Sequence, residues 1–382
     1  MIIDCVYKAL RNKSEVENSL KILADADLLS GDSSVVKQYE EKLRKYFKTK
    51  HAIAVSSGTA ALHASLMNVI NPGDEVLVPA ICVPMTVSAI LQARGIPVFY
   101  DCKEGSFIPD ISCLTRRLTS SSKVLITVSM WGYRAIDSEI VGFCKENNIV
   151  IIEDAAQSAG TYSSLGYEGT VGDIGCFSTH EFKLISTGEG GFVLTNSDSY
   201  AEKIRSYTHI GFNQSCSSFG YADGLNYKLS SFQAAIGISQ LDNLDLKIKN
   251  REKTINVWDS LLLNKCDTIK AMPMPDVIRH NGYSLCCLLD KNQLFSGKYL
   301  ASKIYLSGIN TDTFRYKNTI VSNYPLYNDF YKPPFYYGIN EKDFPNAVAL
   351  VQRMIVFPCH ERITEGAIYQ AAIEILKVLR SM

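Results

Sequence analysis

The chain has 382 residues, with 39 basic and 39 acidic side chains and a formal net charge of zero at pH 7. Because these charges are balanced and interspersed, the composition gives no reason to expect a nucleic-acid partner or an anionic membrane surface. The length is enough for one large domain and a smaller second one.

The sequence carries neither a membrane signature nor a metal-binding signature. No apolar run approaches the roughly 18 residues that a membrane helix needs. An acid, Asp4, stands where a signal peptide would have its basic region, so we expect a cytoplasmic location. The 11 cysteines are scattered, and the 6 histidines show no ligand spacing. We therefore expect reduced, mostly buried thiols and no metal site.

The first strand-to-helix connection is a candidate anion site. Residues 1–30 look helical, and a second helix after Gly31 leads to a short strand at residues 51–55. A turn of small residues then opens a helix rich in Ala and Leu. Free N–H groups and the helix dipole favour phosphate at such a start. The backbone N–H groups of Gly58 and Thr59 are the candidate donors, although the turn alone is equally well explained as an ordinary connection.

Further strands are expected within residues 72–79, 96–101 and 123–130, with helices between them. Strands that alternate with helices at this spacing predict a parallel sheet covered on both faces.

The strongest chemical signal begins with a buried strand that leads into Glu153 and Asp154. The C-terminal end of such a strand is where open α/β sheets bind their ligands. A second apolar strand ends at Ser178, and Lys183 follows it. A carboxylate, a hydroxyl and an amine that converge on one sheet edge suit a pyridoxal 5'-phosphate enzyme. In that interpretation Lys183 forms the Schiff base, Asp154 pairs with the protonated pyridine nitrogen, and Ser178 holds a phosphate oxygen.

Three segments carry a resemblance to a known family. They are Glu153 to Gln157, Ser178 to Lys183, and the glycine-rich turn from Gly188 to Gly191. In order and spacing they resemble the DegT/DnrJ/EryC1/StrS family of sugar aminotransferases, which have fold type I. The resemblance extends over roughly residues 25–375.

The resemblance implies roles for four further positions. Gln157 would lie beside the ring hydroxyl of the cofactor. Val83 stands where the family has an aromatic residue stacked on the pyridine ring, and a valine can still cover the ring by dispersion. Thr86 matches the family, and its hydroxyl serves either the cofactor or the start of a helix. Asn226 would reach the partner's phosphate across a homodimer with shared active sites. After it Lys228 replaces the family's arginine, keeping the charge without the bidentate fork.

The family also implies the fold. We expect a mostly parallel seven-stranded sheet covered by helices, with one antiparallel strand at residues 190–196. The large cofactor-binding domain would span residues 1–245, and a smaller C-terminal α+β domain residues 246–382. The segment 317–342 is rich in Tyr, Pro and Asn, and its aromatic residues either line a substrate pocket or hold a surface loop.

The activity that the resemblance implies is amino transfer from L-glutamate to a keto-sugar, in this family most often a nucleotide-linked one, in amino-sugar and polysaccharide biosynthesis. His180 is expected to pack near the cofactor rather than to transfer protons. Three alternatives remain open. The acceptor could be a keto-cyclitol. The chain could be a sugar dehydratase, although in that branch a histidine replaces the lysine that is present here as Lys183. It could also be a regulator that binds the cofactor without turnover.

Overall fold

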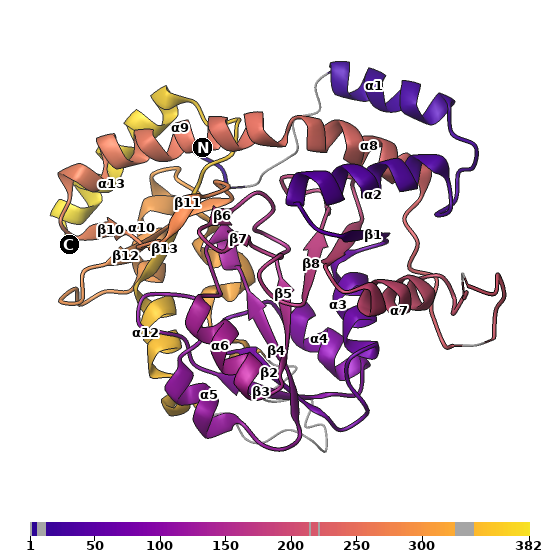
Figure 1. The fold of residues 1–382 in the computed structure, drawn as a ribbon. Coiled ribbons are helices and arrows are strands. Elements are labelled where there is room, and N and C mark those ends of the chain that lie inside the picture. The colour runs from indigo at the N-terminus through magenta and orange to yellow at the C-terminus, as the bar shows by residue number, and fades with distance from the viewer. Residues whose placement is uncertain (1, 6–12, 214, 221, 325–339) are drawn as a thin grey trace.

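The computed structural model describes residues 2–5, 13–213, 215–220, 222–324 and 340–382. It is an α/β protein in which a large sheet lies between helices, with a smaller sheet beside it (Figure 1). The expectations for the aromatic residues of segment 317–342 concern positions that lie largely outside the described ranges.

The large sheet has seven strands in the order β1-β9-β8-β5-β4-β2-β3. Strand β9 is antiparallel to both of its neighbours, and the other pairings are parallel. This confirms the mostly parallel seven-stranded sheet and the antiparallel strand after the glycine-rich turn. The strands are β1 (His51–Val55), β2 (Glu75–Pro79), β3 (Ile96–Tyr100), β4 (Ser122–Val128), β5 (Val150–Asp154), β8 (Ile174–Ser178) and β9 (Gly191–Thr195).

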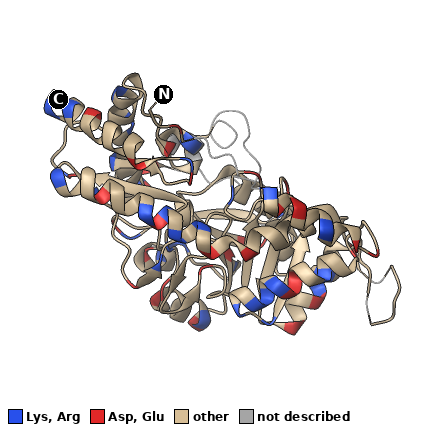
Figure 2. Cartoon of the chain, turned by 90° about the horizontal axis from the view of Figure 1, so that it is seen from above, with Lys and Arg blue, Asp and Glu red and all other residues tan. Residues whose placement is uncertain are grey.

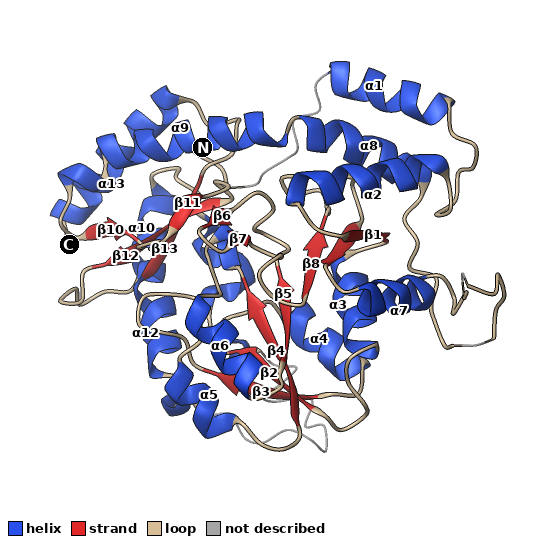
Figure 3. Cartoon of the chain, viewed as in Figure 1, coloured by secondary structure: helices blue, strands red, loops and turns tan. Residues whose placement is uncertain are grey.

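Helices cover both faces of this sheet, as Figure 3 shows. The strands need this cover because they are apolar on both sides: six of the seven residues of β4 are buried. The covering helices are α2 (Ser34–Phe47), α3 (Gly58–Met67), α4 (Pro84–Gln92), α5 (Ile111–Arg117), α6 (Ser138–Glu146) and α7 (Asp198–Thr208).

The C-terminal part contains a second, antiparallel sheet with its own apolar core. Its order is β10-β12-β13, and it packs with three helices. These elements are β10 (Ile269–Ala271), β12 (Ser284–Leu289), β13 (Met354–Pro358), α10 (Gly297–Leu306), α12 (Pro345–Arg353) and α13 (Glu365–Arg380). A third, short sheet is formed by β11 (Val277–Arg279), β6 (Tyr162–Ser163) and β7 (Gly166–Tyr167).

Three helices run along one side of the molecule: α1 (Lys13–Ala24), α8 (Ser231–Asp242) and α9 (Leu244–Leu261). Helix α9 is fixed to the segment after β13 by a buried ion pair, in which Arg251 Nε lies 2.9 Å from Glu361 Oε1. The predicted domain boundary at residue 245 would fall at the start of α9, and it stays a prediction.

Charged residues of both signs are interspersed along the helices (Figure 2). Among the described residues, no helix combines the length and the apolar character that crossing a bilayer requires.

Candidate active site

One cavity of about 290 Å³ lies at the C-terminal edge of the large sheet. Seven of the eight predicted site residues line it, and they come from strand ends, helix starts and the loop after β8. They are Gly58, Thr59, Val83, Asp154, Gln157, Ser178 and Lys183. The fold therefore brings together residues that are up to 125 positions apart (58 to 183) in the sequence.

Asp154, the last residue of β5, is a buried carboxylate with two hydrogen-bond donors. Thr86 Oγ1 donates to Oδ2 at 2.6 Å, and the N–H of Ala156 donates to Oδ1 at 3.2 Å. Burial raises the pKa of Asp154; these donors and the charge of Lys183 act in the opposite direction without cancelling the rise. A buried carboxylate of this kind is stabilised by a cation placed against it.

The contact with Asp154 argues against the helix-cap expectation for Thr86, and its cofactor role stays a prediction. Helix α4 begins after Val83 without a side-chain cap, so the hydroxyl of Thr86 does not cap the helix. It is instead fully buried and directed to the carboxylate.

The start of helix α3 forms a cradle against the end of β8. Ser57 caps the helix through a bond from the N–H of Ala60 to its Oγ, 3.0 Å long. A Cβ on Gly58 would come within 2.8 Å of the Cβ of Ser178. Only glycine allows this approach, which brings the N–H groups of the helix start beside the Ser178 hydroxyl. Such a cradle suits a phosphate group.

Lys183 lies in an irregular loop that is tied together by its own backbone. The N–H of Lys183 donates to the carbonyl of His180 at 2.8 Å, and that of Thr179 donates to Gly190 at 2.8 Å. The Lys183 ammonium lies 5.5 Å from the ring centroid of Tyr283, which is in the C-terminal part of the chain. Both parts of the molecule therefore contribute to the surroundings of this amine.

Gln157 is held in place on the other side of the cavity. Its Oε1 accepts a 2.7 Å hydrogen bond from the N–H of Trp131, and its backbone carbonyl accepts one from Asn281 Nδ2. Trp131 adopts a positive φ of 53°, a conformation that L-residues rarely take.

The sequence interpretation missed Arg315, which also lines the cavity. Its Nε donates to Asp312 Oδ1 at 2.6 Å and its Nη1 to the Tyr283 hydroxyl at 3.2 Å. The guanidinium lies 5.9 Å from the ring centroid of Phe182. No local pattern marks Arg315, because its position depends on the packing of the C-terminal part against the large sheet.

Asn226 does not line the cavity of its own chain. It is exposed and forms an isolated β-bridge with His209. Its predicted role concerns a second chain and stays a prediction. His180 lines the cavity, and its Nε2 lies 3.7 Å from Glu189 Oε1.

Comparisons with known proteins agree with this geometry. The sequence model of the DegT/DnrJ/EryC1/StrS aminotransferase family matches residues 11–375. GDP-perosamine synthases of Caulobacter vibrioides and Escherichia coli O157:H7 are 31% and 30% identical to the chain. These matches span 62% and 61% of this chain but only 64% and 65% of the relatives' lengths. An aminotransferase structure from Psychrobacter cryohalolentis has the same fold, with a TM-score of 0.88, 22% identity and 99% coverage of both chains.

The chain therefore belongs to the DegT/DnrJ/EryC1/StrS aminotransferase family. This confirms the expected fold class, and it confirms the expected cofactor at the level of the family, which depends on pyridoxal 5'-phosphate.

The bond from Thr86 to Asp154 leads to a first prediction. Thr86→Val removes a donor from a buried carboxylate, and such bonds to charged groups contribute about 1.5–3 kcal/mol. We expect this variant to bind pyridoxal phosphate about tenfold or more weakly, as measured by the change in protein fluorescence. Thr115→Val, on the exposed face of α5, should bind the cofactor like the unaltered protein. Unchanged affinity in Thr86→Val would show that this hydrogen bond does not support the site.

Proposed function

We propose that the chain transfers an amino group from L-glutamate to a nucleotide-linked keto-sugar, with pyridoxal phosphate as its cofactor. The observation that carries this proposal is the convergence of the Lys183 amine, the buried Asp154 carboxylate and the start of α3 on one cavity. Family membership supports the same class of reaction.

The residues present fit the cofactor. The N–H groups of Gly58 and Thr59 and the hydroxyl of Ser178 would hold its phosphate in the glycine-dependent cradle. Asp154 would pair with the pyridine nitrogen, which supplies the cation that the buried carboxylate needs. Val83 would cover the ring, Gln157 would lie beside the ring hydroxyl, and Lys183 would hold the cofactor covalently. When bound, the cofactor serves as an electron sink for the carbanion formed at the substrate carbon.

In this proposal Lys183 would also move protons. Once an amino donor has displaced it from the cofactor, its amine would take the proton from the α-carbon of the donor as general base, and would then deliver a proton as general acid to the cofactor carbon that carries the nitrogen. The buried ring of Tyr283 shields one side of the Lys183 ammonium. This shielding helps to exclude water from the proton transfer.

The cavity suits an acidic amino donor. The guanidinium of Arg315 lines it, and a planar guanidinium is well matched to a carboxylate. We infer from this charge, and from the family, that the donor is L-glutamate. The name GDP-perosamine synthase, carried by two relatives, supports a nucleotide-linked sugar as acceptor. The name of a Bacillus subtilis relative, a spore coat polysaccharide biosynthesis protein, supports a role in polysaccharide biosynthesis. We place the reaction in the cytoplasm.

We further propose that the protein acts as a homodimer with shared active sites. An apolar groove between α1 and α8 is lined by partly exposed side chains, among them Val16, Leu20 and Phe232. The exposed position of Asn226 supports its reaching the phosphate of a partner chain.

Mixing inactive Lys183→Ala chains with inactive Asn226→Ala chains should restore some activity, because a mixed dimer would contain one site with both residues. An active monomer in light scattering would contradict the homodimer.

The alternatives receive less support. A dehydratase of this family would have histidine at position 183, and the chain has lysine there. A keto-cyclitol acceptor would be recognised by its aminated product in the test described next. A regulator without turnover would not need the complete set of Asp154, Ser178 and Lys183.

The reaction outcome is a further prediction. Incubation of the holoenzyme with glutamate and nucleotide-linked keto-sugars should yield 2-oxoglutarate and amino sugar in equal amounts, because Lys183 can release the aminated product and reattach the cofactor. The sugar product is followed by mass spectrometry. Gain of an amine supports the proposal. Loss of water without nitrogen incorporation would place the chain with the dehydratases, and amination of a cyclitol alone would change the acceptor class.

A further inference from the structure

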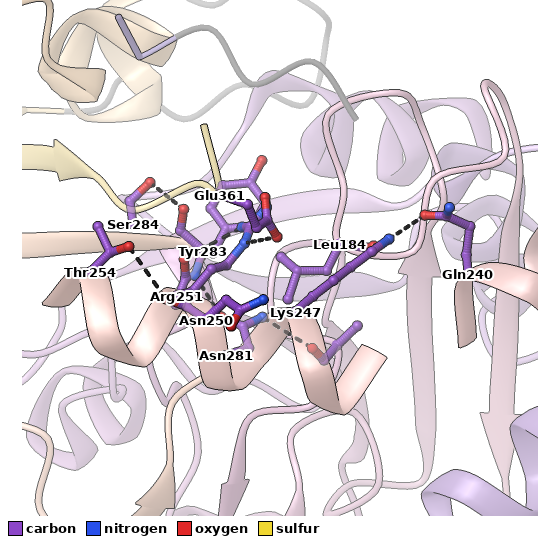
Figure 4. Close-up of polar contacts among 12 residues, drawn as sticks. Leu184, Gln240, Lys247, Asn250, Arg251, Thr254, Asn281, Tyr283, Ser284 and Glu361 are labelled. Carbon is purple, nitrogen blue, oxygen red and sulfur yellow. Dashed lines mark hydrogen bonds and ion pairs between the residues drawn. The ribbon is translucent and has the colours of Figure 1, made fainter. Parts of the chain in front are cut away.

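Lys247 on α9 is a buried lysine that touches the Lys183 loop. It is 8% exposed, and its ammonium donates to the backbone carbonyl of Leu184 at 3.2 Å. It also donates to the side-chain oxygen of Gln240 on α8. Figure 4 shows Lys247 extending from α9 to Gln240, close to Leu184. A lysine is rarely buried unless it has partners of this kind.

Leu184 directly follows Lys183, so a hydrogen bond to its carbonyl restrains the backbone next to Lys183. Residues 179–190 form neither helix nor strand. Several of their backbone groups pair within the loop, whereas the Leu184 carbonyl is paired by Lys247. A hydrogen bond from an ammonium to a carbonyl is stronger than one between neutral groups. The contact with Lys247 therefore fixes the backbone from which the Lys183 side chain extends.

The side-chain amide of Gln240 links the buried ammonium of Lys247 to the carboxylate of Glu15, and we call this link the relay. The Nε2 of Gln240 donates to Glu15 Oε2 on α1 at 3.1 Å, and Asn243 Nδ2 donates to Glu15 Oε1 at 2.9 Å. Glu15 is itself 6% exposed. One row of polar contacts thus joins α1, α8, α9 and the Lys183 loop.

The charges around Lys247 are few. Burial lowers its pKa; Glu15 and Glu361 act to raise the pKa and Arg251 acts to lower it, with a net lowering. Glu361 is already paired with Arg251. Glu15, reached through Gln240, is therefore the main acid that balances the Lys247 ammonium.

We propose that Lys247 is a positioning residue for Lys183. Its ammonium fixes the backbone of the Lys183 loop, and this contact depends on Glu15 of α1, because the relay through Gln240 links the ammonium to the Glu15 carboxylate. The inference rests on the proposed function, in which Lys183 holds the cofactor. Lys247 does not touch the reacting atoms. It acts through the Leu184 carbonyl and through its charge.

The test compares Lys247→Met, which has a similar unbranched shape without the ammonium, with Lys247→Arg, which keeps a cationic donor. Lys249→Met, two residues along the same helix at an exposed position, is the matched control. The readout is a pH titration of the absorption band of the cofactor bound to Lys183, together with the single-turnover rate with glutamate. Thermal unfolding of each variant separates loss of positioning from loss of fold.

Removing a neighbouring cation favours the protonated form of the cofactor–lysine link, so the titration midpoint should move to higher pH. We expect a rise of about half a pH unit or more in Lys247→Met, and a single-turnover rate about tenfold lower with little change in the half-saturating glutamate concentration. Lys247→Arg should restore both values to within about threefold, and Lys249→Met should match the unaltered protein.

If Lys247→Met fails to fold, Glu15→Gln provides the second variant, because it keeps the hydrogen-bond geometry and removes the balancing charge. It should move the midpoint as well, to lower pH, since the cation near Lys183 is then less balanced. Midpoints equal to that of the unaltered protein in every folded variant would overturn the inference. Absence of the absorption band from the unaltered protein would contradict the proposed function instead.

Discussion

The site depends on one buried carboxylate, that of Asp154. It lies at the end of the central strand β5, where the sheet is covered by helices, and burial raises its pKa despite two hydrogen-bond donors. An ionised group in such a place is costly unless a cation faces it. In the function that we propose, the protonated nitrogen of a pyridine ring would supply that cation, and the start of α3 with Ser178 would hold the phosphate of the same ligand.

The elements next to β5 bring the other site residues to the same edge of the sheet as Asp154. Glycine at position 58 lets α3 begin against Ser178, so the start of this helix lies at the same sheet edge, where we propose that the phosphate binds. The glycine-rich turn before β9 reverses the chain, and its backbone ties the loop that carries Lys183. The C-terminal part adds Tyr283 and Arg315, so the cavity is complete only when both parts of the molecule have folded.

Much of this arrangement could be predicted from the sequence because local pattern determines it. Apolar runs of β-branched residues mark the buried strands, and the spacing from Asp154 to Ser178 and Lys183 marks the residues at their ends. Arg315 and Lys247 could not be predicted in this way, since each reaches the site through a residue far away in the sequence, Phe182 for Arg315 and Leu184 for Lys247. The hydroxyl of Thr86 was ambiguous for the same reason: only packing shows that it points to Asp154 rather than to the helix start.

The central claim is that Lys183 is the residue that holds the cofactor in this cavity. The most direct measurement is borohydride reduction of the holoenzyme followed by peptide mapping with mass spectrometry. The account predicts one pyridoxyl phosphate group per chain, on the peptide that contains Lys183, and no labelling of a Lys183→Ala variant. Labelling of a different lysine, or of none, would contradict it.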